Sequence, residues 1–227
     1  MIMKRFFCIL AAAVLAAMPI VAAEPNSREV KTYDVDYFDA LEVSWIYKVD
    51  LKQSRSQSVT IEAPDFIMEY IDVKVRKSRL VLSIKDMPLS LRTKIETGKY
   101  EVLATVSMRK LSSIEMSGTS KLYVDGQFHS DDDVFKMDIS GASAVKDLNI
   151  TAQSADIECT GAAKFEMTGK FKDVKAYLSG AAKGELETDT KALDAKVGGA
   201  SNLSYRAGDK FQLLDTDIAR GATLRRL

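Results

Sequence analysis

The chain has 227 residues, with 32 lysines and arginines against 32 aspartates and glutamates. That length suits one domain with a sizeable core, and the balanced charge excludes a strongly basic protein that binds nucleic acid or an anionic membrane. We therefore expect no nucleic-acid partner.

The first 23 residues have the pattern of a secretory signal peptide. Lys4 and Arg5 precede an apolar run from Phe6 to Ala17, and small residues lead to Ala23. The run is too short for a membrane-spanning helix, and no later segment could form one. We expect cleavage after Ala23 and export to the periplasm, the outer cell surface or the extracellular space.

The cysteine count bears on how the exported chain is stabilised. Cys8 lies in the predicted signal peptide, which leaves Cys159 alone in the mature chain. A lone cysteine forms no internal disulfide, so stability must come from packing. Cys159 occupies an inward position of a predicted strand, and we expect a buried thiol rather than an exposed one used for cross-linking.

The first half of the mature chain is rich in strand-forming residues. Residues 24–34 are expected to form an N-terminal linker. Strands rich in β-branched and aromatic residues are predicted at 38–52, 59–61, 71–75, 80–84 and 100–106. The predicted strand at 38–52 alternates apolar and polar residues, with Ile46 as the only interruption. Residues 64–70 suit a short helical turn that begins with proline, and residues 86–98 suit a loop.

A short glycine-containing phrase recurs six times from residue 114 onward. Its glycines are Gly118, Gly141, Gly161, Gly180, Gly199 and Gly221, which are 23, 20, 19, 19 and 22 residues apart. Apolar residues precede the glycines at every second position, as Ile114 and Met116 do. This alternation indicates strands with one buried face, and the near-constant period is typical of a solenoid.

The repeats predict an all-β, single-stranded parallel β-helix with about 20 residues per coil. Glycine permits positive φ at each corner, and its small neighbours let coils stack about 4.8 Å apart. A βαβ unit needs roughly 30 residues, and the pattern of a leucine-rich repeat is absent. We expect the β-helix domain at 35–227, with irregular first coils at 35–110 and Gly-Ala repeats at 111–227, about ten coils in all.

The same stacking predicts a core column and a terminal coil. The column consists of Met116, Ile139, Cys159, Leu178 and Val197. In the last unit Ile218 lies three residues before Gly221, where earlier units place an apolar residue two before the glycine. Arginines at positions 220, 225 and 226 crowd this unit. We expect the break and the charges to stop further strand addition.

Glycine-over-glycine stacking also aligns charges on the surface. The predicted columns are Glu115, Asp138 and Glu158 on one side of the corner, and Lys121, Lys164 and Lys183, interrupted by Ala144, on the other. Like charges on neighbouring strands cost a few tenths to about 1 kcal/mol, which an adjacent basic column would partly offset. Two interpretations stay open: a solvated mixed face, or a surface binding column whose acids recruit a divalent cation or a basic partner.

Candidate catalytic and metal-binding groups are few. His129, the only histidine, lies in the polar segment 127–133, which we expect to be a solvated loop, whereas a catalytic triad needs a rigidly held base. Asp131, Asp132 and Asp133 lack the ligand spacing of a dedicated calcium loop, although carboxylates suit calcium. No zinc spacing and no phosphate-binding glycine loop occurs. We expect no catalytic residue, no cofactor and no enzymatic activity.

The repeated Ser-Gly-Ala-Ser phrase follows a β-rich half with strands such as residues 38–43. In this combination, residues 35–224 resemble the auto-transporter adhesin head GIN family, a domain of unknown function. Gly198 and Arg220 depart from its repeated phrase, because other units have Ser or Thr there. The resemblance implies a right-handed β-helix exported by Bacteroidetes-type bacteria, and it carries no established catalytic residues.

Together these patterns predict a non-enzymatic, exported cell-envelope protein. We expect an adhesin or surface-binding module whose outer β-helix faces contact a cell surface or a glycan. Two alternatives stay open. One is a polysaccharide-binding or polysaccharide-degrading β-helix protein, in which an enzyme would need convergent carboxylates in one groove. The other is a structural envelope component built from coils stacked end to end.

Overall fold

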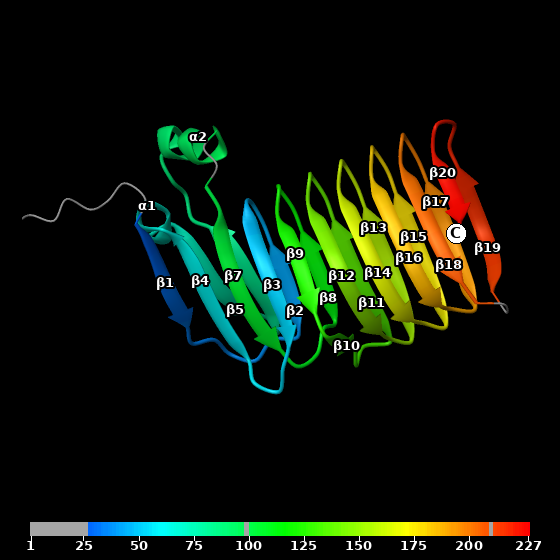
Figure 1. Cartoon of the computed structure of the whole chain (residues 1–227), viewed down its shortest axis with the longest axis horizontal. Helices are drawn as coiled ribbons and strands as arrows, with labels where there is room; N and C mark the ends of the chain where they lie inside the picture. The colour runs from blue at the N-terminus through cyan, green and yellow to red at the C-terminus, as the bar shows by residue number, and fades with distance from the viewer. Residues whose placement is uncertain (1–26, 98–99, 209–210) are drawn as a thin grey trace, which may run out of the picture.

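Strands dominate the computed structural model, which describes residues 27–97, 100–208 and 211–227. They wind into a β-solenoid of about 6 turns with coils of about 20 residues, so the predicted parallel β-helix is confirmed. Figure 1 shows the coils as a row of stacked strands. The expectation of about ten coils is wrong, because much of 35–110 forms hairpins and helices instead. The predicted signal peptide, residues 1–23, lies outside the described residues.

Six coils turn at a glycine corner, with one strand before the corner and one after it. The pairs are β8 (Ser113–Met116) and β9 (Lys121–Asp125), β11 (Val134–Ile139) and β12 (Ala144–Thr151), β13 (Ser154–Cys159) and β14 (Lys164–Lys170), β15 (Asp173–Leu178) and β16 (Lys183–Asp189), β17 (Ala192–Val197) and β18 (Asn202–Ala207), and β19 (Gln212–Ile218) and β20 (Thr223–Arg226). Strands before the corners form sheet B, and strands after them form sheet A. Every pairing among these strands is parallel.

The corners stack directly on one another, as the glycine spacing predicts. Gly141 has φ 72°, and a Cβ there would lie 2.5 Å from the carbonyl oxygen of Gly118. The amide of Ala142 donates a hydrogen bond of 2.8 Å to the same oxygen. The same contacts recur at Gly161, Gly180 and Gly199 and bring successive backbones too close for a side chain, whereas at Gly221 an added Cβ would lie 3.4 Å from the carbonyl oxygen of Gly199.

A further coil precedes these six, and Trp45 forms its corner. β2 (Ala40–Val43) pairs with β8, and β3 (Tyr47–Gln53) pairs with β9, in the same registers as the later coils. Trp45 has φ 79° and accepts a hydrogen bond of 2.7 Å from the amide of Thr119. The prediction of one strand across 38–52 is therefore wrong, because the chain turns there from sheet B to sheet A.

The remaining N-terminal strands extend both sheets beyond this coil. In sheet A, β7 (Val102–Met108) lies beside β3, followed by the antiparallel strands β4 (Ser58–Pro64) and β1 (Arg28–Tyr33). In sheet B, β6 (Arg79–Ile84) lies beside β2 and forms a hairpin with β5 (Ile71–Arg76). Residues 28–33, which we expected in a linker, thus form an edge strand.

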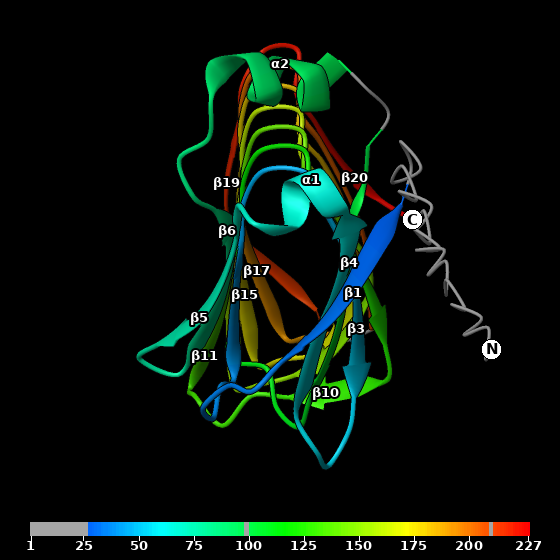
Figure 2. The same cartoon turned by 90° about the vertical axis from the view of Figure 1, so that its left-hand side faces the viewer.

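Two helices lie at this end of the solenoid. α1 (Asp65–Met68) confirms the predicted helical turn, and its residues Ile67 and Met68 are buried. It lies across the end of the coils (Figure 2). α2 (Leu89–Thr97) occupies the segment predicted as a loop, and that prediction is wrong. Ile95 is its only buried residue, so the sequence has no periodic pattern of apolar residues that would predict the helix.

The core lies between the two sheets and is built from in-register columns. The predicted column of Met116, Ile139, Cys159, Leu178 and Val197 is buried and aligned. In register it continues to Val43, which is buried, at one end and to Ile218, which is exposed, at the other. Asp147, which breaks the alternation, has φ 58° and lies at a bulge that lets Leu148 take the inward position. The fold tolerates such irregularities because bulges restore the register.

Candidate functional site

The predicted acidic column exists as a geometric feature of sheet B. Asp138 pairs in register with Glu115 on one side and with Glu158 on the other, and all three side chains are exposed. Glu42 of β2 extends the column by one coil. Glu42 was not predicted in this column because residues 38–52 were expected to form a single strand outside the repeats.

Arg79, at the start of β6, neutralises the N-terminal end of this column. Its guanidinium lies 2.5 Å from the carboxylate of Glu115 and 3.6 Å from that of Glu42. The hairpin with β5 positions Arg79, since Lys77 and Ser78 take φ values of 50° and 60° in the connecting turn. Within the described part of the chain, the carboxylates of Asp138 and Glu158 form no ion pair.

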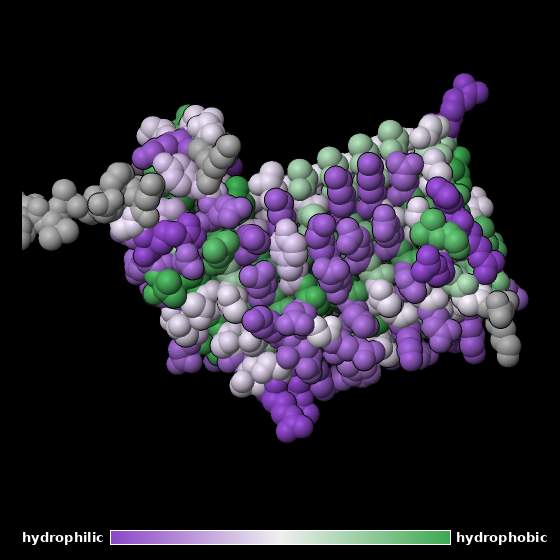
Figure 3. Space-filling view, in the orientation of Figure 1, coloured by the Kyte–Doolittle hydropathy of each residue, from purple (hydrophilic) through white to green (hydrophobic). Residues whose placement is uncertain are grey.

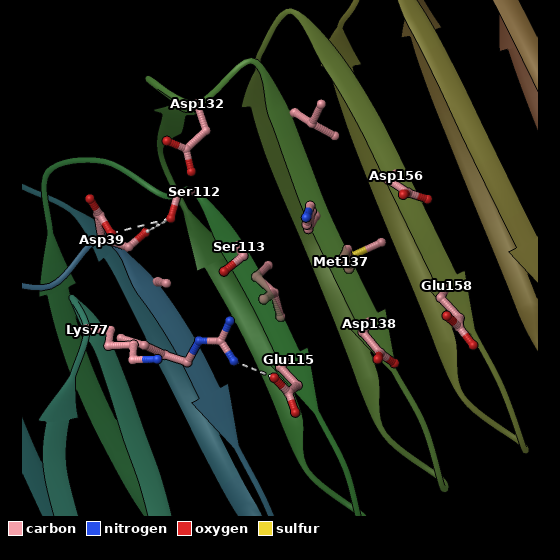
Figure 4. Close-up of a pocket in the computed structure, with 15 residues that line it drawn as sticks. Asp39, Lys77, Ser112, Ser113, Glu115, Asp132, Met137, Asp138, Asp156 and Glu158 are labelled. Carbon is pink, nitrogen blue, oxygen red and sulfur yellow. Dashed lines mark hydrogen bonds and ion pairs between the residues drawn. The ribbon is translucent and has the colours of Figure 1, made fainter.

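A shallow depression of about 590 Å³ covers this part of sheet B. Its lining includes six acids, Asp39, Glu115, Asp132, Asp138, Asp156 and Glu158, and three bases, Lys77, Arg79 and Lys136. We call these nine residues the acidic face. Figure 4 shows Glu115, Asp138 and Glu158 in equivalent places on three successive strands. The acids exceed the bases by three, so the face favours cationic groups.

One edge of the acidic face is ordered by hydrogen bonds. The hydroxyl of Ser112 donates to the main-chain oxygen of Asp39 at 3.1 Å and to its carboxylate at 3.3 Å (Figure 4). The hydroxyl of Tyr37 donates to the same carboxylate at 3.2 Å, and the pKa of Tyr37 is raised by partial burial first, and then by the charge and the hydrogen bond of Asp39. In the column itself, strand register fixes the spacing of the backbone that carries the carboxylates.

The predicted basic column is likewise in register, but it lies on the outer face of sheet A. Ala144 pairs with Lys121 and Lys164, and Lys164 pairs with Lys183. Lys48 of β3 adds one more lysine. Figure 2 shows the two sheets as opposite walls, and Figure 3 shows hydrophilic rows along the outside of sheet A. The expectation that the basic column offsets the acidic one as an adjacent column is therefore wrong.

His129 lies in the short strand β10 (Gln127–His129), which pairs with β12, so the loop prediction is wrong there. Its side chain is exposed, and its Nε2 lies 3.5 Å from the carboxylate of Asp131. Lys110 donates to Asp131 and lowers the pKa of that carboxyl. Across residues 27–97, 100–208 and 211–227, no group of three or more His, Cys, Asp or Glu side chains is placed to hold a metal ion.

The buried titratable groups serve the core. Cys159 is fully buried, and burial raises the pKa of its thiol to about 12. Burial also raises the pKa of Tyr47, whose hydroxyl donates to the carbonyl oxygen of Ser83 at 3.0 Å. Both groups are held in their neutral forms, which suits packing rather than nucleophilic chemistry.

The described residues contain no helix that is long and apolar enough to cross a membrane. A comparison with curated proteins found no match to the chain.

Three solved structures share the fold. A putative adhesin from Bacteroides fragilis is 17% identical, with a TM-score of 0.61 over 88% of this chain and 97% of its own. A putative adhesin from Parabacteroides distasonis is 12% identical, with a TM-score of 0.52 over 89% and 98%. A putative lipid binding protein from Parabacteroides distasonis is 10% identical, with a TM-score of 0.52 over 88% and 96%.

Family membership follows from the sequence itself. The family described as "putative auto-transporter adhesin, head GIN domain" matches residues 37–222, which span the Trp45 coil, the N-terminal strands that follow β1 and all six glycine corners. The match agrees with the resemblance noted in the repeats, and the chain belongs to this family.

Proposed function

We propose that the protein is an exported, non-enzymatic binding module of the adhesin type. Its acidic face contacts a cationic group on a cell surface or an envelope component. The observation that carries this proposal is the acidic face itself, in which six acidic side chains outnumber three basic ones on the outside of sheet B. Export rests on the predicted signal peptide, and the adhesin class on the family and its structural neighbours.

The geometry of the column suits a repetitive cationic partner. Glu115, Asp138 and Glu158 stand on neighbouring strands, about 4.8 Å apart. Their mutual repulsion is relieved by Arg79 only at one end, so a bound cation at Asp138 and Glu158 would gain electrostatic energy. The strands hold the backbone of these residues in place before binding, so only their side chains lose freedom on association, which limits the entropy lost.

Charge complementarity of this kind makes two demands on a partner. The partner must present amines or guanidinium groups at a similar spacing, as a basic peptide or an aminated polymer does. The attachment must also weaken with salt, because the Debye length falls from about 10 Å at 0.1 M to about 3 Å at 1 M. A divalent cation that bridges the column to an anionic partner is the alternative use of the same carboxylates.

The test compares neutral variants on the two faces of the solenoid. Residues 24–227 are labelled, and their attachment to bacterial cells and to immobilised polylysine is measured at low and high salt. We expect D138N/E158Q to weaken attachment about five-fold or more at low salt. The matched control is E166Q/E185Q, which removes two in-register acids from sheet A. Equal attachment by both double variants would overturn the proposal.

A further inference from the structure

One corner of the solenoid has a tryptophan where the other six have a glycine. Trp45 has φ 79°, in the region where the six later corners carry glycine. Its backbone fits directly under Gly118, whose added Cβ would lie 2.5 Å from the Trp45 carbonyl oxygen. A large side chain in this conformation is strained, and such strain concentrates where a side chain has a use that glycine could not serve.

Trp45 lines a depression of about 390 Å³ beside the corner ridge. The depression is bounded by the first two corners, by the segment that follows β6, and by α2, which lies at the level of the corners in Figure 2. Its apolar lining comes from Trp45, Ile84 and Met87, and its charged lining comes from Lys85, Asp86 and Arg92. The two bases exceed the single acid, in contrast to the acidic face on sheet B.

The two basic side chains at this depression differ in whether they form an ion pair. The side chain of Lys85 is exposed and forms no ion pair within the described ranges. Arg92 pairs with Glu96 at 3.0 Å along α2, which holds the guanidinium while leaving further N–H donors. Ser44 and Ser117 add hydroxyl groups at the corner side. Trp45 is half-buried and packs partly against the core, and the part of it that lines the depression lies among lysine, arginine and serine donors and one aspartate.

We propose that this depression binds a saccharide. The indole of Trp45 lies against the C–H face of a pyranose ring, and Lys85 and Arg92 contact a carboxylate substituent of an acidic sugar. A pyranose offers one apolar face and a polar edge, which matches an aromatic surface with polar groups at its rim. This site goes beyond the proposed function, because it lies on the corner ridge and stands whether or not the acidic face binds a partner.

The chain carries its own probe for this site. Trp45 is the only tryptophan, so its fluorescence reports on this place alone. The mature protein is titrated with trigalacturonate and with maltotriose, and free N-acetyltryptophanamide serves as the optical control. We expect a saturable change with trigalacturonate and binding about five-fold weaker with maltotriose. No saturable change with either sugar, or equal affinity for both, would overturn the proposal.

The decisive variant is Trp45→Gly, measured by calorimetry because it removes the fluorophore. It replaces the strained residue with the one that six other corners use, so the circular dichroism spectrum should be unchanged while trigalacturonate binding is lost. Lys85→Gln, at an exposed position, should weaken trigalacturonate binding several-fold and leave maltotriose unaffected. Retained binding in the folded Trp45→Gly protein contradicts the site. The variant D138N/E158Q should bind trigalacturonate normally, which separates this test from that of the acidic face.

Discussion

A corner glycine of this solenoid is constrained in two ways at once. Its φ lies in the left-handed region, and its α-carbon lies against the carbonyl oxygen of the corner below, as Gly141 lies against Gly118. Gly198 shows the contrast within a single repeat. It lacks a positive φ, and the nearest atom to an added Cβ is 3.8 Å away. The two glycines therefore respond differently to the same added methyl group.

We expect Gly141→Ala to lower the free energy of unfolding by about 2–4 kcal/mol, since it combines backbone strain with a steric overlap. Gly198→Ala is the control and should change stability by about 0.5 kcal/mol or less. Denaturation in urea, followed by circular dichroism, measures both. Similar losses in the two variants would show that stacking does not set the requirement for glycine.

Cys159 gives a second prediction at the level of a single residue. Burial raises the pKa of its thiol from 9.0 to about 12, so the unfolded chain releases this proton at a lower pH than the folded chain does. The folded state therefore loses stability as the pH rises from about 9 towards 12.

Cys159→Ala removes that contribution. Its free energy of unfolding should fall less steeply than that of the parent protein between about pH 9 and pH 11, although the cavity lowers its stability at neutral pH. Urea titrations at several pH values measure both slopes. Parallel slopes would mean that the thiol is not shielded from water in the folded protein.

The elements show where local sequence patterns determine structure and where they do not. The glycine repeats carry both the strand period and the coil period, so they predict sheet, corner and register together. The coil at Trp45 was not predicted because Trp45 fits the period-two alternation of a continuous strand. Its residue type therefore gives no sign that the chain turns a corner there. The spacing of Trp45 from Gly118 is also far from 20 residues, because the N-terminal hairpins and helices lie between them in the chain.

The same limit applies to the candidate site. The alignment of Glu115, Asp138 and Glu158 follows from repeat spacing alone. Arg79 could not be placed, since its position depends on the pairing of β6 with β2. The opposite placement of the acidic and basic columns was missed because alternation shows which residues point outward, and gives no angle between the two strands that meet at a corner.

Arg79 should contribute to stability through the hairpin of β5 and β6 to which it belongs. We expect Arg79→Gln to lower stability by about 0.5–1 kcal/mol at low salt, because Glu42 and Glu115 then repel each other without a counter-charge. The difference should shrink at about 1 M salt, where screening is strong. Arg76→Gln in the same hairpin is the control, as Arg76 is exposed and forms no ion pair within residues 27–97, 100–208 and 211–227. A loss that is unchanged by salt would assign Arg79 a packing role instead.

At the scale of the whole molecule, the two described ends of the solenoid differ. The N-terminal end carries antiparallel strands and α1 over the core. At the other end, β19 and β20 each pair on one side only within the described residues, and Leu213 and Leu214 are exposed. Arg226 folds back there: its guanidinium lies 5.7 Å from the Phe211 ring and donates to the Ala207 carbonyl oxygen at 3.1 Å. The predicted break in register is absorbed at the corner, because Ile218 stays aligned with Val197.

The three arginines of this last coil are predicted to keep its strand edge from pairing with another molecule. Replacing residues 220, 225 and 226 with threonine removes the positive charges and leaves a strand-forming edge beside exposed leucines, so we expect dimers or larger species. Light scattering coupled to size-exclusion chromatography at about 100 µM measures this. The control exchanges Lys121, Lys164 and Lys183 for threonine, the same charge change on the paired strands of sheet A. A monomeric arginine variant would mean that backbone geometry or the irregular corner at Gly221, rather than charge, blocks strand addition.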